Sequence, residues 1–526
     1  MIRTRFAPSP TGYLHIGGVR TALFCRLFAK HEGGRFILRI DDTDKERNVE
    51  DALNPILHGL QWLGITWDEG PEVGGPFAPY YQSERNAFYQ EAVDALLASG
   101  FAYKDYARPE ELAAERDAFN AAKTAGAYTY SRTWMGDTPE KQAEFEAQGR
   151  VAVVRLKMPR EGKLEFNDLV RGNVVFDWRQ EQDHVIQRAD GSFIYHLANV
   201  VDDHAFEISH VIRAEEHLSN TPRQIFIIDA LGWERPQYAH LPFVAEPGSH
   251  TKLSKRKLEK YMKNRDFAKI VDHGMSVASR LGCEVKLETF NPVVTDFFEQ
   301  VGYLPEAIIN YLALLGWSLD DKTEEFTPDE LVELFSLERV NKAPASFDPA
   351  KLMSFQERAM QKLSLDEKYS GTLPFILRGK MIPGIEKEED ISDALRDKIC
   401  ALLKAAGDRI KVFGDILDYP DFFASHEALA YDSAAVEKRL KKPGAIELLE
   451  KFAKKLADVD CWTAGEVEEV MRLFLEEEQI KVGEIIHALR VASTGKSVGI
   501  GVFETLEILG KEETEKRIQR ALCLAR

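Results

Sequence analysis

Two short motifs, far apart in the 526-residue chain, carry residue types suited to phosphate chemistry. The first, His15-Ile-Gly-Gly18, places a histidine before two glycines where a helix is expected to begin. Gly17 and Gly18 would let backbone N–H groups approach phosphate oxygens, and the helix dipole would attract negative charge. Taken alone, a glycine turn with a capping histidine is the better explanation of this motif.

The second motif, Lys252-Leu-Ser-Lys-Arg256, follows a predicted strand over 237–244 and a glycine-containing loop. Lys252 and Lys255 suit polyphosphate chemistry, which needs positive charge where negative charge grows in the transition state. The motif opens a run of eighteen residues, 252–269, with eight Lys or Arg and two acids, in a chain whose formal net charge is −18. This run predicts an anionic partner, although a solvated loop explains such runs when they stand alone.

The elements around the first motif indicate a parallel sheet. Residues 2–6 favour a strand, the Pro8–Gly12 turn breaks it, and apolar positions 19, 23 and 27 mark one face of a helix. Residues 35–40 form a second strand, which delivers Asp41, Asp42 and Asp44. Ligands bind at the carboxyl ends of parallel strands, so we expect His15 and Asp41 at one α/β site.

Composition narrows the class of protein. The length predicts three or four domains, and 44% hydrophobic with 29% charged residues is typical of a globular chain. No window approaches about 20 apolar residues, and Met1 leads straight into Arg3 and Arg5, so we expect a cytoplasmic protein without membrane contact. The five cysteines are scattered, which favours buried thiols over disulfides or a CxxC zinc site.

The two motifs resemble the signatures of class I aminoacyl-tRNA synthetases, and residues 3–15 look like the opening of bacterial glutamyl-tRNA synthetases. Further matches follow in order along most of the chain: Asp41–Asp44, Gln82–Arg85, Tyr195–His204, His210–Arg213, Leu218–Gln224, Ile485–Ala492 and Gly495–Gly499.

The resemblance implies an architecture. Residues 1–100 and 190–250 would form a split, Rossmann-like nucleotide-binding catalytic domain, interrupted at 101–189 by an α/β acceptor-stem domain. This insertion begins with a polar, helical stretch over 103–149, and then Val151–Met158 and Asn173–Phe176 are predicted strands joined through Arg171-Gly172. Residues 251–330 would contact the stem, and 331–526 would form an all-α anticodon-binding region, including helices over 466–478 and 482–489.

The resemblance also implies roles. His15, Gly17, Gly18, Lys252, Ser254 and Lys255 would bind ATP, with His15, Lys252 and Lys255 catalytic. Arg5, Tyr195 and Arg213 would hold the side-chain carboxylate of L-glutamate, and Ser9, Asp41 and Asn199 its head group. Mg²⁺ would arrive with ATP, and no protein ligand is assigned to it. Without the family, an ion pair of Arg213 with Glu215 or Glu216 and a half-buried core ring for Tyr195 are the preferred interpretations.

Three positions depart from the family pattern. Some members bind zinc through a CxC pair in the inserted domain, but residues 103–107 here contain no cysteine, so we predict no zinc. Asp41 stands where glutamyl enzymes usually have Glu and glutaminyl enzymes Asp. Residues 257–294 form an insertion of about thirty residues to which no role is assigned.

Three other patterns are given structural interpretations. Thr494–Ser497 resembles the end of a phosphate loop but follows a helix, so it is predicted to be a helix-to-helix turn. His196, His204, His210 and His217 are spaced irregularly over a predicted strand and loop, which favours core or surface histidines over a metal site. Basic residues at 438–442 suit a helix end, with tRNA phosphates as the alternative partner.

The predicted function is that of a glutamate–tRNA ligase, which makes glutamyl adenylate from ATP and glutamate and transfers the acyl group to tRNA-Glu. Charging of tRNA-Gln as well stays open, and a monomer is expected. The alternatives are a glutaminyl-type ligase, disfavoured by the helical carboxyl half, a small-molecule adenylyltransferase, and a tRNA-binding protein without catalysis.

Overall fold

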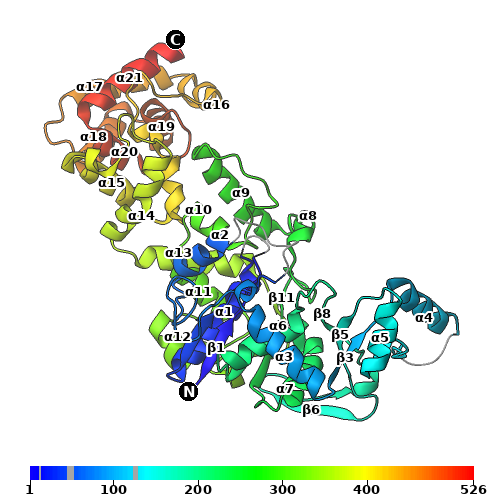
Figure 1. Cartoon of the computed structure of the whole chain (residues 1–526). Helices are drawn as coiled ribbons and strands as arrows, with labels where there is room; N and C mark the ends of the chain where they lie inside the picture. Colours follow the sequence, from blue (N-terminus) through cyan, green and yellow to red (C-terminus); the bar gives the residue numbers. More distant parts are fainter. Residues whose placement is uncertain (11–13, 44–52, 123–127) are drawn as a thin grey trace. The chain divides into compact units, whose positions relative to one another are not determined.

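The computed structural model describes residues 1–10, 14–43, 53–122 and 128–526 (Figure 1). Asp44 and the end of the predicted Pro8–Gly12 turn lie outside the described residues. The described chain divides into two compact units, of which the first comprises 1–268, 287–297 and 305–352, and the second 269–286, 298–304 and 353–526.

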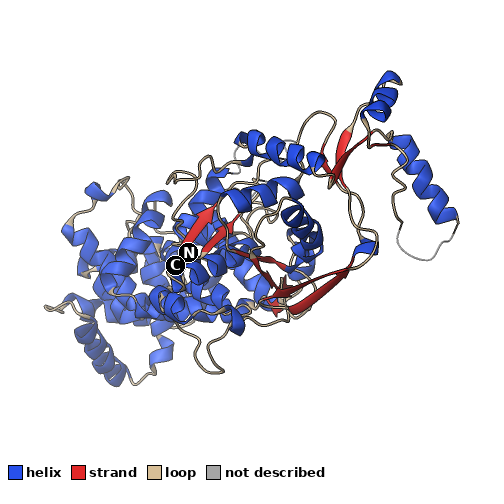
Figure 2. Ribbon diagram, turned by 60° about the horizontal axis from the view of Figure 1, so that its bottom comes forward, coloured by secondary structure: helices blue, strands red, loops and turns tan. Residues whose placement is uncertain are grey.

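The first unit is built on a six-stranded sheet in the order β2-β1-β9-β10-β6-β7. Every neighbouring pair is parallel except β6 and β7. Phe36, Ile37 and Leu38 of β2 are all buried, as expected for a parallel strand covered on both faces. The strands lie among helices in Figure 2. The predicted α/β class with a parallel sheet is confirmed.

The strands of this sheet are β1 (Arg3–Phe6), β2 (Arg35–Leu38), β6 (Lys163–Asp168), β7 (Gly172–Asp177), β9 (His210–Ala214) and β10 (Gln237–Leu241). The helices of the first unit include α1 (Ile16–His31), α2 (Leu53–Trp62), α3 (Asn86–Ala98), α4 (Pro109–Ala121), α5 (Pro139–Ala147), α6 (Tyr195–Ala205), α7 (Thr221–Ala230), α8 (Leu258–Tyr261), α11 (Pro305–Ala313) and α12 (Pro328–Leu334). Helices α9 (Arg265–Arg280), α10 (Thr295–Val301) and α13 (Pro349–Lys362) have residues in both units.

A second, antiparallel sheet has the order β4-β3-β5-β8, formed by β4 (Met135–Gly136), β3 (Ala102–Asp105), β5 (Val153–Leu156) and β8 (Val185–Gln187). The prediction of a helical stretch over 103–149 is therefore wrong at its start. The predicted direct link between two strands through Arg171-Gly172 is also wrong, because β7 pairs with the unpredicted β6 in the main sheet. Gly172 permits the tight hairpin with a φ of +82°.

The predicted strand over 237–244 is divided in two. Pro242 lacks an N–H donor, and β10 ends just before it, at Leu241. The chain resumes as β11 (Val244–Ala245), which pairs with β12 (Ala345–Ser346) in a separate two-stranded sheet. This break matters because β11 leads into the loop that carries the signature lysines.

The placement of four histidines in a strand and loop also needs correction. His196 and His204 lie in helix α6, His210 begins β9, and His217 lies in a short 3-10 helix. The His204 ring stacks on Trp233, with 3.9 Å between ring centres. Among the described residues, no group of three or more His, Cys, Asp or Glu could hold a metal ion.

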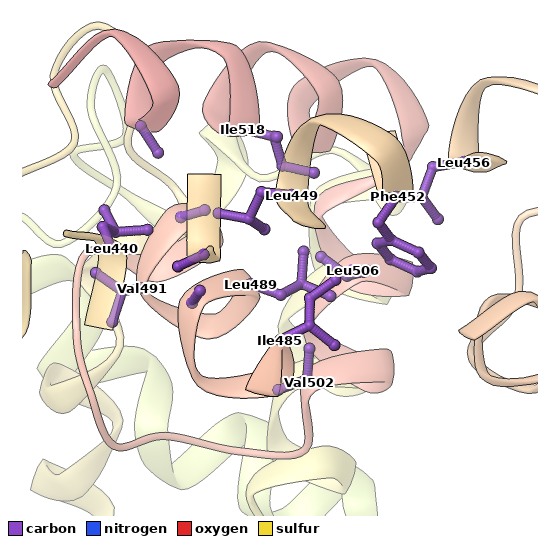
Figure 3. Packing of buried hydrophobic residues seen from close by; sticks show 14 of the residues in the cluster. Leu440, Leu449, Phe452, Leu456, Ile485, Leu489, Val491, Val502, Leu506 and Ile518 are labelled. Carbon is purple, nitrogen blue, oxygen red and sulfur yellow. The ribbon is translucent and has the colours of Figure 1, made fainter. Parts of the chain in front are cut away.

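The elements lying wholly within the second unit are helical throughout its described residues. Its longer helices are α14 (Leu365–Arg378), α15 (Asp393–Ala406), α17 (Ala445–Ala457), α18 (Ala464–Glu478), α19 (Ile486–Thr494), α20 (Val502–Leu509) and α21 (Lys511–Ala525). Figure 3 shows buried apolar side chains of this unit, including Leu449, Phe452, Leu489 and Ile518, packed in one cluster. These side chains come from several helices and give the unit its own core.

The helix predicted over 466–478 is found as α18, whereas the one predicted over 482–489 is displaced: a 3-10 turn covers Val482–Glu484, and α19 begins only at Ile486. Helix α19 ends at Thr494, and Gly495 takes a left-handed conformation with a φ of +73° before α20 begins. The interpretation of Thr494–Ser497 as a helix-to-helix turn is confirmed. No helix among the described residues is both long enough and apolar enough to cross a membrane.

Candidate active site

A cavity of about 970 Å³ lies at the carboxyl ends of β1, β9 and β10. It is lined by all twelve predicted site residues: Arg5, Ser9, His15, Gly17, Gly18, Asp41, Tyr195, Asn199, Arg213, Lys252, Ser254 and Lys255. The fold thus brings the two distant motifs to one cavity, at the sheet edge where parallel strands place their ligands. What each residue does there remains a prediction.

His15 is the N-cap of helix α1. Its Nδ1 accepts a hydrogen bond from the Gly17 N–H at 3.0 Å, and the Ile16 N–H donates to the Val293 carbonyl at 3.1 Å. The Gly18 N–H donates to the His15 carbonyl at 2.8 Å. The N–H groups of Gly17 and Gly18 themselves thus have partners within the chain, and the approach of backbone N–H groups to phosphate stays a prediction. A Cβ on Gly17 would meet Nδ1 at 3.2 Å, so this glycine makes room for the cap.

The protonation state of His15 follows from the same geometry. Burial and the nearby charges of Lys255 and Lys252 lower the pKa of His15 to about 3. The ring is neutral at physiological pH, and because Nδ1 accepts from Gly17, the proton resides on Nε2. His15 is therefore a neutral hydrogen-bond donor at the mouth of a helix N-terminus.

The second motif follows β11. The Lys252 ammonium pairs with Glu216, and burial lowers the pKa of Lys255. The Ser254 hydroxyl accepts a hydrogen bond from the Arg256 N–H, which starts a short 3-10 turn. Positive charge is thus gathered at the cavity within reach of His15, whose pKa both lysines lower, and Glu216 compensates part of it.

A buried ion network lies beneath the cavity. Arg39, with a fully buried side chain, donates to Asp41 at 2.7 Å and to Asp203 at 2.7 Å. Asp203 also accepts from Arg5 Nε at 3.0 Å and Nη2 at 3.1 Å. Burial outweighs the Arg39 charge and raises the pKa of Asp41 to about 6. The guanidinium of Arg5 is consequently compensated by an acid before any substrate enters.

Arg213 has a different environment. Its side chain donates to His240 Nε2 at 3.0 Å and to the Thr221 hydroxyl at 2.9 Å, and Nη1 has no hydrogen-bond partner among the described residues. The residue is 5% exposed, and burial lowers its pKa. Both partners are uncharged donors or acceptors, with the pKa of His240 itself lowered by burial. Arg213 is thus a buried cation without a direct acidic partner in the described structure.

The ion pair expected for Arg213 without the family is not found, whereas Tyr195 is half-buried as expected but lines the cavity. Glu215 pairs with Arg171 and Glu216 with Lys252, so neither acid compensates Arg213. Tyr195 begins helix α6, lines the cavity and places its hydroxyl 3.5 Å from His217 Nδ1. An anion entering this cavity would meet a guanidinium that has no direct carboxylate partner among the described residues, with Asp168 reached only through His240 and Asp203 acting on its charge without a hydrogen bond. A carboxylate site needs such a donor.

Comparison with known proteins identifies the family. Residues 1–283 and 286–354 match the model of the tRNA synthetases class I (E and Q), catalytic domain, and residues 369–522 match an anticodon binding domain. The chain belongs to the class I tRNA synthetases. Two proteins named glutamate–tRNA ligase are close in length: that of Moorella thermoacetica is 38% identical over 99% of this chain and 98% of its own, and that of Dehalococcoides mccartyi is 39% identical over the same shares.

Solved structures agree with this assignment. The crystal structure of a glutamate tRNA ligase from Elizabethkingia meningosepticum, in complex with its amino acid, has a TM-score of 0.83, 33% identity and full coverage of both chains. The glutamate–tRNA synthetase of Elizabethkingia anophelis has a TM-score of 0.78 and 33% identity over 99% of both chains. The predicted synthetase family and its glutamate–tRNA ligase activity are confirmed.

Sequence reasoning missed several residues of this synthetase site. Arg39 and Asp203 orient Arg5 and Asp41. The sequence signal for Arg39 was an arginine in an apolar predicted strand, and for Asp203 an acid in an apolar helix. Arg20, one turn into α1, lines the cavity at 2% exposure, and its Nη1 donates to the Pro242 carbonyl at 2.6 Å. Burial lowers the pKa of Arg20 to about 10.

The sheet β4-β3-β5-β8 has buried, paired acids in and beside residues 103–107, the stretch whose lack of cysteine predicts no zinc. Asp105 accepts from the Tyr130 hydroxyl at 2.7 Å and pairs with Arg155 at 2.5 Å. Asp183 accepts from the Tyr103 hydroxyl at 2.8 Å and pairs with Arg132 at 2.6 Å. These ion pairs and hydrogen bonds connect segments of the chain that are far apart in sequence. The absence of zinc stays a prediction.

Proposed function

We propose that this glutamate–tRNA ligase activates L-glutamate with ATP in the 970 Å³ cavity and esterifies tRNA-Glu. An oxygen of the α-carboxylate of glutamate attacks the α-phosphorus of ATP. The bond from this phosphorus to the oxygen that bridges to the β-phosphate breaks, and pyrophosphate leaves. The 3′-terminal ribose hydroxyl then attacks the activated carbonyl, and AMP leaves. The observation that carries the proposal is the buried Arg213, without a direct acidic partner among the described residues, in the same cavity as both signature motifs.

Arg213 and Tyr195 are assigned to the side-chain carboxylate of glutamate. A guanidinium presents a fork of donors that matches a carboxylate, and a phenol adds a further donor. Arg5 takes a smaller part than its sequence position implies, because two of its nitrogens already bind Asp203. Neutral glutamine would leave Arg213 unpaired, and this cost supports glutamate as the amino acid.

The head group of glutamate is assigned to Asp41, Ser9 and Asn199. An ionised Asp41 would attract the substrate ammonium, and Arg39 holds this carboxylate in place through two hydrogen bonds. Asn199 is 3% exposed and its Oδ1 accepts from Gln224 Nε2 at 2.9 Å, which fixes the amide plane. Both residues are held by neighbours before the substrate arrives, so little ordering remains to be done on binding.

The ATP phosphates are assigned to His15, Lys252, Ser254 and Lys255. The neutral His15 ring offers its Nε2–H to a phosphate oxygen, and Lys255 meets the charge that develops as pyrophosphate leaves. Lys252 would exchange its Glu216 partner for phosphate. Gly17 and Gly18 leave room at the start of α1. Mg²⁺ bound to the phosphates would neutralise part of their charge, and we assign it no protein ligand.

The helical second unit supports a tRNA partner, since residues 369–522 match an anticodon binding domain, and the similarity to glutamate–tRNA ligases supports tRNA-Glu. A glutaminyl-type ligase remains disfavoured by this helical carboxyl half. We expect a monomer acting in the cytoplasm, and both remain predictions.

Aminoacylation of separate tRNA-Glu and tRNA-Gln transcripts with labelled glutamate and glutamine tests the proposal. We expect glutamate on tRNA-Glu. Glutamate on both transcripts would widen the tRNA range without changing the amino-acid site, whereas glutamine on tRNA-Gln would contradict the assignment of Arg213.

A further inference from the structure

The loop that carries the signature lysines is tied down at its base. The Glu246 N–H donates to the Thr251 carbonyl at 2.7 Å, and the Leu253 N–H donates to the Val244 carbonyl at 2.8 Å. Ala245 and Lys252 form an antiparallel bridge. The turn between them is therefore short, and Lys252 has a fixed backbone position. Residues 254 and 255 follow this hairpin and lie beyond its backbone hydrogen bonds.

Glu246 reaches beyond the hairpin with its side chain. The carboxylate is 1% exposed and accepts from Lys257 Nζ at 2.7 Å and from Lys260 Nζ at 2.5 Å. These two hydrogen bonds hold the pKa of Glu246 below its usual range. A buried carboxylate is stable only when it is paired, so Glu246 fastens the start of α8 to the base of the loop.

Tyr261 secures the same loop from the other end of α8. Its hydroxyl accepts the Ser254 N–H at 3.0 Å, and its ring is 2% exposed. The ring packs edge-on against Phe267, which packs against Phe347, at centre distances of 5.5 Å and 6.3 Å. Ser254 is thus connected, through the Tyr261 hydroxyl and two edge-to-face ring contacts, to Phe347, which directly follows β12.

The basic run 252–269 therefore does more than line the cavity. Lys252, Lys255 and Lys257 line it, and Lys257 and Lys260 are bound to Glu246. We propose that Glu246 and Tyr261 are positioning residues, which hold Ser254 and Lys255 at the cavity before ATP arrives. This inference rests on the proposed function, and it gives the first part of the insertion at 257–294 a role. A loop that is ordered before ATP binds loses less conformational entropy on binding, so a larger part of the binding free energy can stabilise the transition state.

The test compares Tyr261→Phe with Tyr311→Phe. Tyr311 is a matched control, because it is also buried, it also accepts a backbone N–H, that of Asp348 at 2.8 Å, and it lies outside the cavity lining. ATP–pyrophosphate exchange is measured in the presence of tRNA, together with thermal unfolding. Loss of one hydrogen bond is expected to lower kcat about fivefold to tenfold in Tyr261→Phe, with the KM for glutamate unchanged. Tyr311→Phe should lose comparable stability but keep kcat.

Glu246→Gln provides a second variant that keeps the shape and removes the charge. It should lower kcat in the same way, and Glu246→Asp should restore part of it. A double-mutant cycle with Lys255→Ala separates positioning from general destabilisation, because Tyr261→Phe should have no further effect once Lys255 is absent. Wild-type kcat in both Tyr261→Phe and Glu246→Gln, or losses that simply multiply with that of Lys255→Ala, would overturn the inference. Wild-type activity in Lys255→Ala would instead refute the proposed function of the loop.

Discussion

Replacing Arg213 with alanine tests whether its guanidinium holds the glutamate side chain. The residue is 5% exposed, has only the uncharged partners His240 and Thr221, and leaves Nη1 unpaired within the described structure. Truncating one partner of a buried, hydrogen-bonded charge pair costs about 2–5 kcal/mol, and each 1.4 kcal/mol is a factor of ten. We therefore expect kcat/KM for glutamate to fall by roughly 30-fold to 4,000-fold.

The preference for glutamate over glutamine should shrink at the same time, because the charge that penalises glutamine is gone. Arg213→Lys should recover only part of the loss, since an ammonium is a point charge and lacks the two-pronged geometry. ATP–pyrophosphate exchange with each amino acid, in the presence of tRNA, measures both effects.

Arg235→Ala is a suitable control for the Arg213 experiment. Arg235 forms an exposed ion pair with Asp229 and lies outside the lining of the 970 Å³ cavity. The Arg235→Ala variant should therefore keep kcat/KM for glutamate within about twofold of the wild-type value. An Arg213→Ala variant that folds and activates glutamate as well as wild type would refute the reasoning, because Arg213 would then be a structural residue.

Four further outcomes are expected. Lys255→Ala should lower kcat for aminoacylation by roughly 100-fold or more while tRNA affinity, measured by filter binding, changes little. Burial raises the pKa of Asp41 to about 6, and Asp41 must lose its proton to attract the substrate ammonium. The value of kcat/KM for glutamate should therefore fall as the pH drops below about 6, and Asp41→Asn should remove this dependence from the pH profile. Elemental analysis should find no stoichiometric zinc, and activity should survive chelation once magnesium is restored. Affinity for tRNA should fall with salt with a slope that reflects a handful of displaced counterions, and a salt-independent affinity would contradict binding through local basic patches.

The sequence alone determined the elements with strong local signals. The runs over 2–6 and 35–40 predicted two strands of a parallel sheet, and the structure makes them neighbours, with Phe6 paired to Leu38 in register. The strand ends predicted that His15 and Asp41 share a site, because residues at the carboxyl ends of parallel strands meet at one edge, and the family resemblance added Lys252 to it. Where polar alternation was short, as in Ala102–Asp105, the strand was missed, since pairing with distant strands outweighs weak local preference.

Only the tertiary structure decided which charges compensate one another. In the sequence, Arg213 stands two and three residues before Glu215 and Glu216, and an ion pair among them was the simplest interpretation. The fold instead brings Arg171 and Lys252 to these acids and Asp203 to Arg5, across separations of 36 to 198 residues. Partners of buried charges are set by which elements pack together, and sequence spacing carries little information about that. Among the described residues, the difference between Arg5, which binds Asp203 directly, and Arg213, which has no direct acidic partner, is therefore a property of the fold.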